Sequence, residues 1–291
     1  MMLDSMTLKS EIAMSDHVKV LAVASGKGGV GKTNLSTNLA VALAKLGQQV
    51  VLLDADLGLA NVDILLGLQP EHDLKDVVSG EKTLEEIMLE GPAGLRIIPA
   101  SSGVEHMASF SELECAGLIN AFSAMESELD VLLVDAAAGI AGDVLTFTRA
   151  AQEILVVVCD EPTSITDAYA LMKVLSTQYN VRKFHVVASM VNDEAHGLAV
   201  YEKLLDVTDR FLEIGLRYLG AVPFDEQLRK AVRAQETVVT RYPRAPSSKS
   251  FSKMAEKVIG WDSAGGVSGQ LQFFLERILS SATPPDRLTG S

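Results

Sequence analysis

Short apolar runs alternate with segments of helical periodicity along most of this chain. Strands that alternate with helices at this spacing form βαβ units, so the pattern predicts an α/β fold: a mostly parallel sheet with helices on both faces. The predicted strands are residues 18–24, 49–53, 95–99, 130–134, 154–159, 184–191 and 216–222. The predicted helices include residues 34–46, two short helices within 73–89, 111–125 and 251–261.

The same pattern divides the chain into three parts. Residues 1–17 show weak periodicity and are expected to form a flexible N-terminal lead, residues 18–261 form the α/β domain, and residues 262–291 form a linker and a C-terminal amphipathic helix. Within the last part, Gln270–Ser280 carries one apolar stripe at helical spacing. Its polar face lacks the several basic residues of a typical interfacial helix, so docking on the chain's own domain and weak membrane contact stay equally open.

Composition narrows the class of protein. The 291 residues and the 48% hydrophobic content suit one α/β domain with an ample core. A net charge of −13 argues against a sequence-independent grip on DNA, so no direct nucleic-acid binding is expected. The chain has only two cysteines, no apolar stretch long enough to span a membrane and no signal-peptide pattern at its N-terminus. We therefore expect a cytoplasmic protein.

A glycine-rich loop between the first predicted strand and helix carries the clearest chemistry. Its sequence, S-G-K-G-G-V-G-K-T, has the G-x-x-x-x-G-K-[ST] spacing of a phosphate-binding P-loop. The glycines let backbone N–H groups turn toward an anion, Lys32 reaches the β- and γ-phosphates, and the Thr33 hydroxyl ligates Mg²⁺. The residues expected to contact the nucleotide are Gly26, Lys27, Gly28, Gly29, Val30, Gly31, Lys32, Thr33 and Asn34.

Acidic residues follow two of the predicted strands. Asp54 and Asp56 come after strand 49–53, and Asp135 closes strand 130–134. The carboxyl ends of parallel strands are where α/β sheets bind ligands, and an acid closing a hydrophobic strand is typical of the Walker B position, which holds Mg²⁺ through water. One acid of the 54–56 pair has a plainer alternative role as a helix cap.

Several segments resemble one family of ATPases. The second lysine of the loop, Lys27, resembles the deviant Walker A motif of the MinD/ParA class, and D-A-D-L-G at 54–58 resembles its switch I signature. Residues 58–63 (G-L-A-N-V-D) and 161–169 (E-P-T-S-I-T-D-A-Y) narrow the resemblance to the FlhG/FleN branch, the MinD-like ATPases that set flagellar number. As a plainer alternative, Thr163 or Ser164 caps the following helix.

The resemblance implies ATP and Mg²⁺ as cofactors and assigns roles to individual residues. Lys27 would cross a dimer interface to the partner's phosphates, and Asp56 would orient the attacking water and touch the Mg²⁺ shell. Asp54 would bond to metal-bound water or Lys32, and Ala136 departs from the Thr or Ser usual in the class. The implied catalytic residues are Lys27, Lys32 and Asp56, and the implied metal site comprises Thr33, Asp56 and Asp135.

In the class, the ends of the strands that correspond to residues 184–191 and 216–222 face adenine and ribose. By this analogy Asn192, Pro223 and Asp225 are the candidates for contacts with the base, although Asn and Asp are also common turn residues. Both readings stay open from the sequence.

The resemblance also implies partners. The expected protein is an ATPase switch that forms a homodimer in the ATP state and limits flagellar number, with weak membrane contact through Gln270–Ser280 and a place at a cell pole. Its partners would be an FlhF-like GTPase and a FleQ-like enhancer-binding activator. Residues 1–17 lack the D-Q-A-x-x-L-R motif that stimulates FlhF, which favours restraint of the activator. The alternatives are a ParA-type partitioning ATPase, a MinD-type division-site ATPase, or a metabolic kinase or synthetase.

Overall fold

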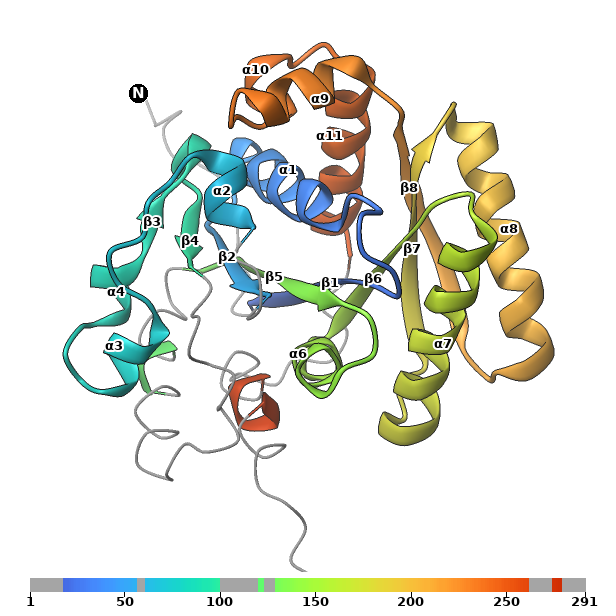
Figure 1. The fold of residues 1–291 in the computed structure, drawn as a ribbon, viewed down its shortest axis with the longest axis horizontal. Coiled ribbons are helices and arrows are strands. Elements are labelled where there is room, and N and C mark those ends of the chain that lie inside the picture. The colour runs from blue at the N-terminus through green and yellow to red at the C-terminus, as the bar shows by residue number, and fades with distance from the viewer. Residues whose placement is uncertain (1–17, 57–60, 100–119, 123–128, 262–273, 279–291) are drawn as a thin grey trace, which may run out of the picture.

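The sheet of this protein has eight strands in the order β3-β4-β2-β5-β1-β6-β7-β8 (Figure 1). The computed structural model describes residues 18–56, 61–99, 120–122, 129–261 and 274–278. All neighbouring strands pair in parallel except β3 with β4. The strands are β1 Lys19–Ser25, β2 Val50–Ala55, β3 Leu89–Glu90, β4 Arg96–Ile98, β5 Val131–Ala138, β6 Glu153–Val158, β7 Lys183–Val191 and β8 Gly215–Pro223.

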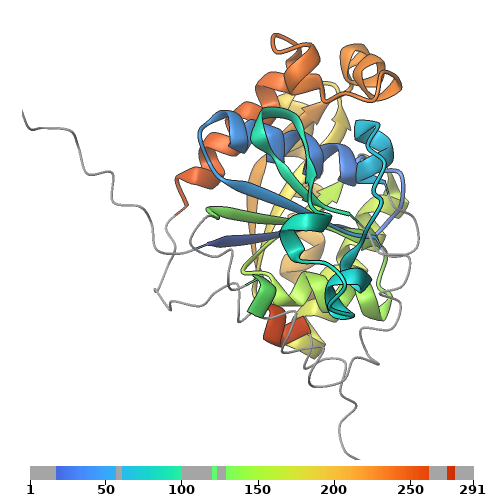
Figure 2. The same ribbon diagram turned by 90° about the vertical axis from the view of Figure 1, so that its left-hand side faces the viewer.

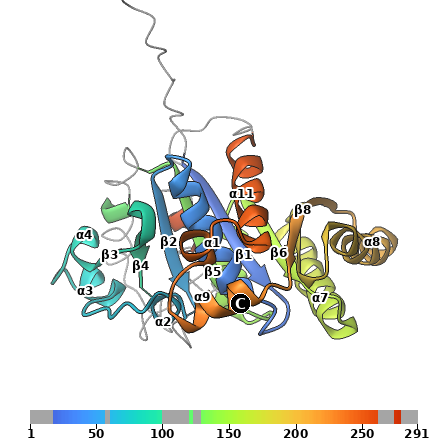
Figure 3. The ribbon, with the colours of Figure 1, turned by 90° about the horizontal axis from the view of Figure 1, so that it is seen from above.

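Helices cover both faces of the sheet, as the alternating pattern predicts (Figures 1 and 2). One face carries α1 Lys32–Lys45, α2 Val62–Leu66, α9 Glu226–Arg233, α10 Val238–Arg241 and α11 Pro246–Ile259. The other carries α3 Leu74–Val78, α4 Leu84–Ile87, α6 Gly142–Ala150, α7 Pro162–Tyr179 and α8 Glu194–Phe211. Seen from above, β3, β4, α3 and α4 lie at one end of the sheet and β8 with α8 at the other (Figure 3).

The strand order places the glycine-rich loop at the middle of the sheet. β1 lies between β5 and β6, and its side chains are almost fully buried because helices pack above and below it. The chain leaves β1 through α1 on one face, whereas β5 connects to β6 through α6 on the other. A crevice at the carboxyl end of the central strand is where doubly wound sheets bind their ligands.

The seven strands predicted from apolar runs are all present, and the two-residue strand β3 was not predicted. Both short helices within 73–89 exist, and each begins at a capping box, formed by Asp73 with Asp76 and by Thr83 with Glu86. Two boundaries were wrong. α11 begins at Pro246 rather than at residue 251, and β5 continues to Ala138, so Asp135 lies inside the strand rather than at its end. The extension exists because Ala138 pairs with Ser25 of β1.

Some predictions fall where the structure describes little. Of the predicted helix 111–125, residues 120–122 are helical and the others lie outside the described residues, as does the whole lead 1–17. The division of the chain at residues 17 and 262 stays a prediction. None of the helices in the described ranges is long and apolar enough to cross a membrane.

Residues 274–278 form a turn of helix against the α6 face of the sheet (Figure 1). Phe274, Leu275 and Ile278 are at most 2% exposed and belong to the same buried cluster as Phe147 and Ala150 of α6. Glu276 and Arg277 face outward. In these residues the predicted apolar stripe packs on the chain's own core.

Candidate nucleotide-binding site

The glycine-rich loop follows β1 directly and leads into α1. Gly29 and Gly31 have φ angles of 80° and 89°, a left-handed conformation that glycine adopts without strain. Gly26 meets a different requirement, since a Cβ there would lie 2.2 Å from the backbone carbonyl group of Asp167 in α7. The loop therefore needs glycine both to turn its N–H groups and to pass close to α7.

Lys32 and Asp135 form a buried pair beneath this loop. The Lys32 Nζ donates to Asp135 Oδ1 at 2.9 Å, and the Ser36 hydroxyl donates to the same oxygen at 2.6 Å. Asp135 is fully buried, and its Oδ2 atom has no hydrogen-bond partner among the described residues. A buried carboxylate oxygen without a donor is costly, so this atom suits a water molecule of a metal shell.

Asp54 organises the segment that follows β2. Its carboxylate accepts three backbone hydrogen bonds of 3.1 Å, from the N–H groups of Asp56, Asn61 and Val62. Burial, together with the neighbouring Asp135 carboxylate, raises the pKa of Asp54 to about 6 against these hydrogen bonds. Asp54 does not bond to Lys32, and its carboxylate instead holds the start of α2, as the alternative role had it. Its bond to metal-bound water stays a prediction.

A cavity of 730 Å³ opens above the loop, and several of the predicted phosphate and metal residues line it, whereas the buried Asp135 does not. Lys32, Thr33 and Asp56 all line it. Asp56 also accepts a hydrogen bond from the Asn61 side chain at 3.2 Å. Gly139, with φ 105°, donates its N–H to the Ser25 carbonyl at 2.9 Å and so joins the end of β5 to the loop. These groups can hold a triphosphate, a metal ion and a water molecule side by side.

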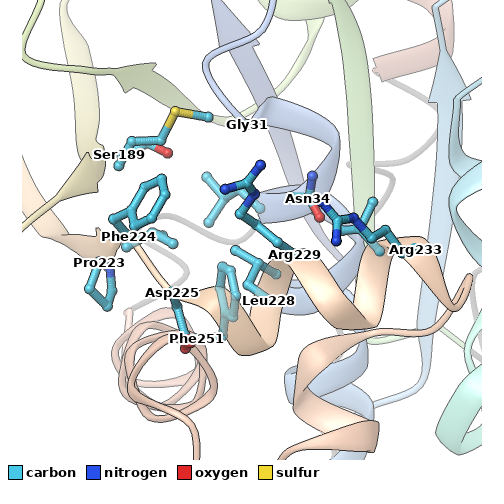
Figure 4. Close-up of a pocket in the computed structure, with 14 residues that line it drawn as sticks. Gly31, Asn34, Ser189, Pro223, Phe224, Asp225, Leu228, Arg229, Arg233 and Phe251 are labelled. Atoms are coloured by element: carbon cyan, nitrogen blue, oxygen red, sulfur yellow. The ribbon is translucent and has the colours of Figure 1, made fainter.

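A second cavity, of 490 Å³ and largely apolar, shares Gly31 and Asn34 with the first (Figure 4). Pro223, the last residue of β8, and Asp225 line it, and its size and lining suit a base. Asn192 lies elsewhere, in a depression between α8 and α11, so its contact with the base stays a prediction.

The carboxylate of Asp225 is occupied by structural bonds. It accepts from the backbone N–H of Gln227 at the start of α9 and from both the N–H and the hydroxyl of Ser247. Burial raises its pKa, but the bonds from Ser247 and α9 outweigh burial and hold the pKa below its ordinary value. Asp225 therefore shapes the pocket wall, as expected of a turn residue, and its contact with the base stays a prediction.

Sequence reasoning missed three further residues of this pocket, Met190, Arg229 and Arg233. Arg229 rises from α9 between Phe224 and Asn34, with its guanidinium 5.7 Å from the centre of the Phe224 ring (Figure 4). Met190 sits at an irregularity of β7 with φ 56°, which turns it toward the glycine-rich loop. The helical spacing of Arg229 and Arg233 after the P-F-D turn was the only signal in the sequence.

Lys27 lines neither cavity. Its Nζ donates to Glu161 Oε2 at 2.5 Å and to the Thr163 hydroxyl at 3.1 Å, at the start of α7. The hydrogen bond with Glu161 raises the pKa of Lys27 despite some desolvation. Thr163 therefore bonds to Lys27, and Ser164 accepts from the Cys159 N–H, so neither caps α7 as the plainer alternative had it.

A parallel sheet, a glycine-rich loop that runs from its central strand into a helix, and a buried Lys–Asp pair beneath that loop together define a P-loop nucleotide-binding protein. Comparisons with known proteins narrow the class. The family model for ParA, described as an NUBPL iron-transfer P-loop NTPase, matches residues 17–259. The antiactivator FleN of Pseudomonas aeruginosa is 53% identical over 90% of this chain and 94% of its own length.

Two more similarities agree with this placement. The flagellum site-determining protein YlxH of Helicobacter pylori is 34% identical, covering 93% of each chain. The crystal structure of the cell division ATPase MinD of Pyrococcus furiosus superposes with a TM-score of 0.67 at 25% identity, covering 84% of this chain and 99% of that one. The chain belongs to the ParA/MinD family of P-loop ATPases, in its FlhG/FleN branch.

Proposed function

We propose that this protein is a cytoplasmic, ATP-dependent dimerising switch that limits flagellar number by restraining an enhancer-binding transcription activator and acting with an FlhF-like GTPase. The names of the two relatives, an antiactivator and a flagellum site-determining protein, support the flagellar assignment. The proposal that the protein acts as a switch rests on the position of Lys27. In the single chain, this second lysine of the loop bonds to Glu161 and leaves its own phosphate cavity to Lys32.

ATP fits the two connected cavities. The triphosphate would lie over the loop, where Lys32 would exchange Asp135 for the β- and γ-phosphates, and the adenine would enter the apolar cavity near Pro223, Phe224 and Arg229. Thr33 would ligate Mg²⁺, with Asp135 and Asp56 holding its water molecules. The ion would supply positive charge against the charge that develops on the phosphates. Asp56 would orient the attacking water for slow, in-line hydrolysis.

The rim of these cavities suits a second copy of the chain. Ile64, Ile140, Met190 and Phe224 are each at least half exposed around the nucleotide cavities and the end of β5. Large apolar side chains gathered at one site indicate a surface that a partner covers. ATP would select the dimer if its phosphates offer Lys27 of the partner a better site than Glu161 does.

The C-terminal helix, which carries the apolar stripe, also changes position in the proposed cycle. The helix is docked in the monomer and released for weak membrane contact in the ATP dimer. Its burial against α6 supports the docked half of this cycle.

Docking of this helix has a measurable consequence for stability. Phe274→Ala should lower the free energy of unfolding by about 3 kcal/mol, since a fully buried aromatic ring is removed from a packed cluster. Urea denaturation of the full chain measures this. Glu276→Ala, which changes an exposed residue on the same helical turn, is the control and should change stability by less than ~0.5 kcal/mol. An equal effect of the two variants would contradict docking.

The flagellar assignment is tested by counting flagella per cell by electron microscopy in a strain that lacks this gene. We expect more flagella than in the parent, and the wild-type gene should restore the parental number. A gene encoding Lys27→Ala should not restore the parental number. The variant should still fold, because Lys27 is on the surface. Normal flagella with minicells would instead favour the MinD alternative, and lost plasmids or chromosomes the ParA alternative.

A further inference from the structure

A cavity of 610 Å³ lies where the parallel strands β6 and β7 begin, at the edge of the sheet opposite to the one that carries the glycine-rich loop. It is formed where α6 and α7 end and β6 and β7 begin, beside the docked turn 274–278. In Figure 1 this turn and α6 lie together on the side of the sheet away from α1. Neither nucleotide cavity reaches this region, so its chemistry is not used by the proposed ATPase cycle.

The lining of this cavity is strongly basic. Arg149, the adjacent pair Arg182 and Lys183, and Arg277 come from three separate segments and all line it, and no carboxylate lines it among the described residues. The chain as a whole carries a net charge of −13, so four cations gathered around one hollow run against its overall charge. Like charges held together repel one another unless an anion lies between them.

Among the described residues, Glu153 at the start of β6 is an acid close to this cavity. Its carboxylate bonds to the buried His185 at 2.7 Å and also interacts electrostatically with Lys183 without forming an ion pair with it. Arg149 and Lys183 form no ion pair with any carboxylate in the described part of the chain. Arg182 bonds to the Asn180 side chain and to the Glu213 carbonyl, both of which are uncharged acceptors.

Two of the cations are held in place before any ligand arrives. Asn180 ends α7 in a left-handed conformation, φ 57°, and its side-chain oxygen accepts from Arg182 Nε at 2.9 Å. The Arg149 guanidinium lies 4.8 Å from the centre of the Tyr179 ring, within the range of a cation–π contact. Fixed guanidinium groups are the side chains best suited to bidentate binding of phosphate oxygens.

Arg277 couples this cavity to the C-terminal helix. It lies on the same turn as the buried Phe274 and Ile278, so it reaches the cavity only while that turn is docked on α6. An anion that binds all four cations would therefore bind the docked form and hold it. At a concentration of ~100 times its dissociation constant, such a ligand raises the ratio of docked to released helix roughly a hundredfold.

We propose that this basic cavity binds a soluble phosphate-bearing anion, which keeps the C-terminal helix docked. A lipid headgroup is the less suitable source of phosphate, since a membrane-inserted helix would carry Arg277 away from the cavity. The consequence for membrane contact rests on the proposed function, whereas anion binding and docking do not.

Pyrophosphate added to the isotopically labelled full chain tests the proposal by backbone amide NMR, which separates this site from the glycine-rich loop. We expect shifts in residues 178–183 that saturate, together with slower hydrogen exchange at 274–278. Lys183→Gln should weaken the response at 178–183 at least tenfold without changing the response at 26–33. Lys173→Gln is the matched control, because it removes the same charge from an exposed site on α7 outside the cavity.

Arg277→Gln provides a second variant. It should weaken pyrophosphate binding and remove the effect of pyrophosphate on exchange at 274–278. Shifts confined to 26–33 would overturn the proposal. So would binding of phosphatidylglycerol vesicles that depends on Lys183 while pyrophosphate has no effect at 178–183, since the cavity would then serve a lipid. Because none of these measurements involves flagella, failure here is distinguishable from failure of the proposed function.

Discussion

Replacing Lys27 with alanine will leave ATP binding intact and lower the ATPase rate about a hundredfold. The nucleotide cavities of one chain are lined without Lys27, which bonds instead to Glu161 and Thr163. Affinity for ATP in a single chain should therefore change little. In the proposed dimer, Lys27 stabilises charge on the partner's phosphates, and removal of one such group typically costs ~10²–10³ in rate. Fluorescent-nucleotide binding and phosphate release measure the two quantities separately.

The bond to Glu161 makes a second variant informative. Glu161→Gln removes the anion that holds Lys27 in the monomer, so the ATP dimer should form at a lower protein concentration. The shift should be modest, roughly two- to fivefold, because exposed ion pairs are weak. Glu86→Gln, which alters a different exposed ion pair far from the loop, is the control. If Lys27→Ala still dimerises and hydrolyses ATP normally, or if Glu161→Gln weakens dimerisation, the proposed transfer of Lys27 between chains is wrong.

Local patterns predicted most of the fold and the phosphate part of the site. The apolar runs and the G-x-x-x-x-G-K-T spacing each depend on residues close in sequence, and their physical meaning is the same in any α/β sheet. The boundary of β5 could not be read in this way. Its last residues are kept in the sheet by pairing with β1 and β2, which lie far earlier in the chain.

Side-chain partners were the least predictable feature. Glu161 lies 134 residues from Lys27, and nothing in its local sequence shows which cation it holds. Asp54 and Asp56 look alike at the end of one strand, yet Asp54 is buried and accepts from backbone N–H groups, whereas Asp56 lines the cavity. The base pocket joins α9 to β7 and β8, so Arg229 and Met190 became candidates only in three dimensions.

The buried pair of Lys32 and Asp135 contributes to both stability and activity. Lys32→Met should lower the ATPase rate at least a hundredfold, because the charge on the β- and γ-phosphates loses its main partner within the chain. It should also lower the free energy of unfolding by about 3 kcal/mol, because Asp135 would remain fully buried with only Ser36 as a donor. Lys253→Met, on the exposed face of α11, is the control for the substitution itself.

A double variant separates the two effects. Adding Asp135→Asn to Lys32→Met removes the unpaired charge, and an amide can still accept from Ser36, so most of the lost stability should return. The ATPase should not return, since neither the lysine nor the carboxylate is restored. Urea denaturation and phosphate release on the same preparations give both results. If the single variant is as stable as the parent, the carboxylate of Asp135 does not depend on Lys32 for its charge partner. If the double variant recovers hydrolysis along with stability, Lys32 acts through folding and not on phosphate.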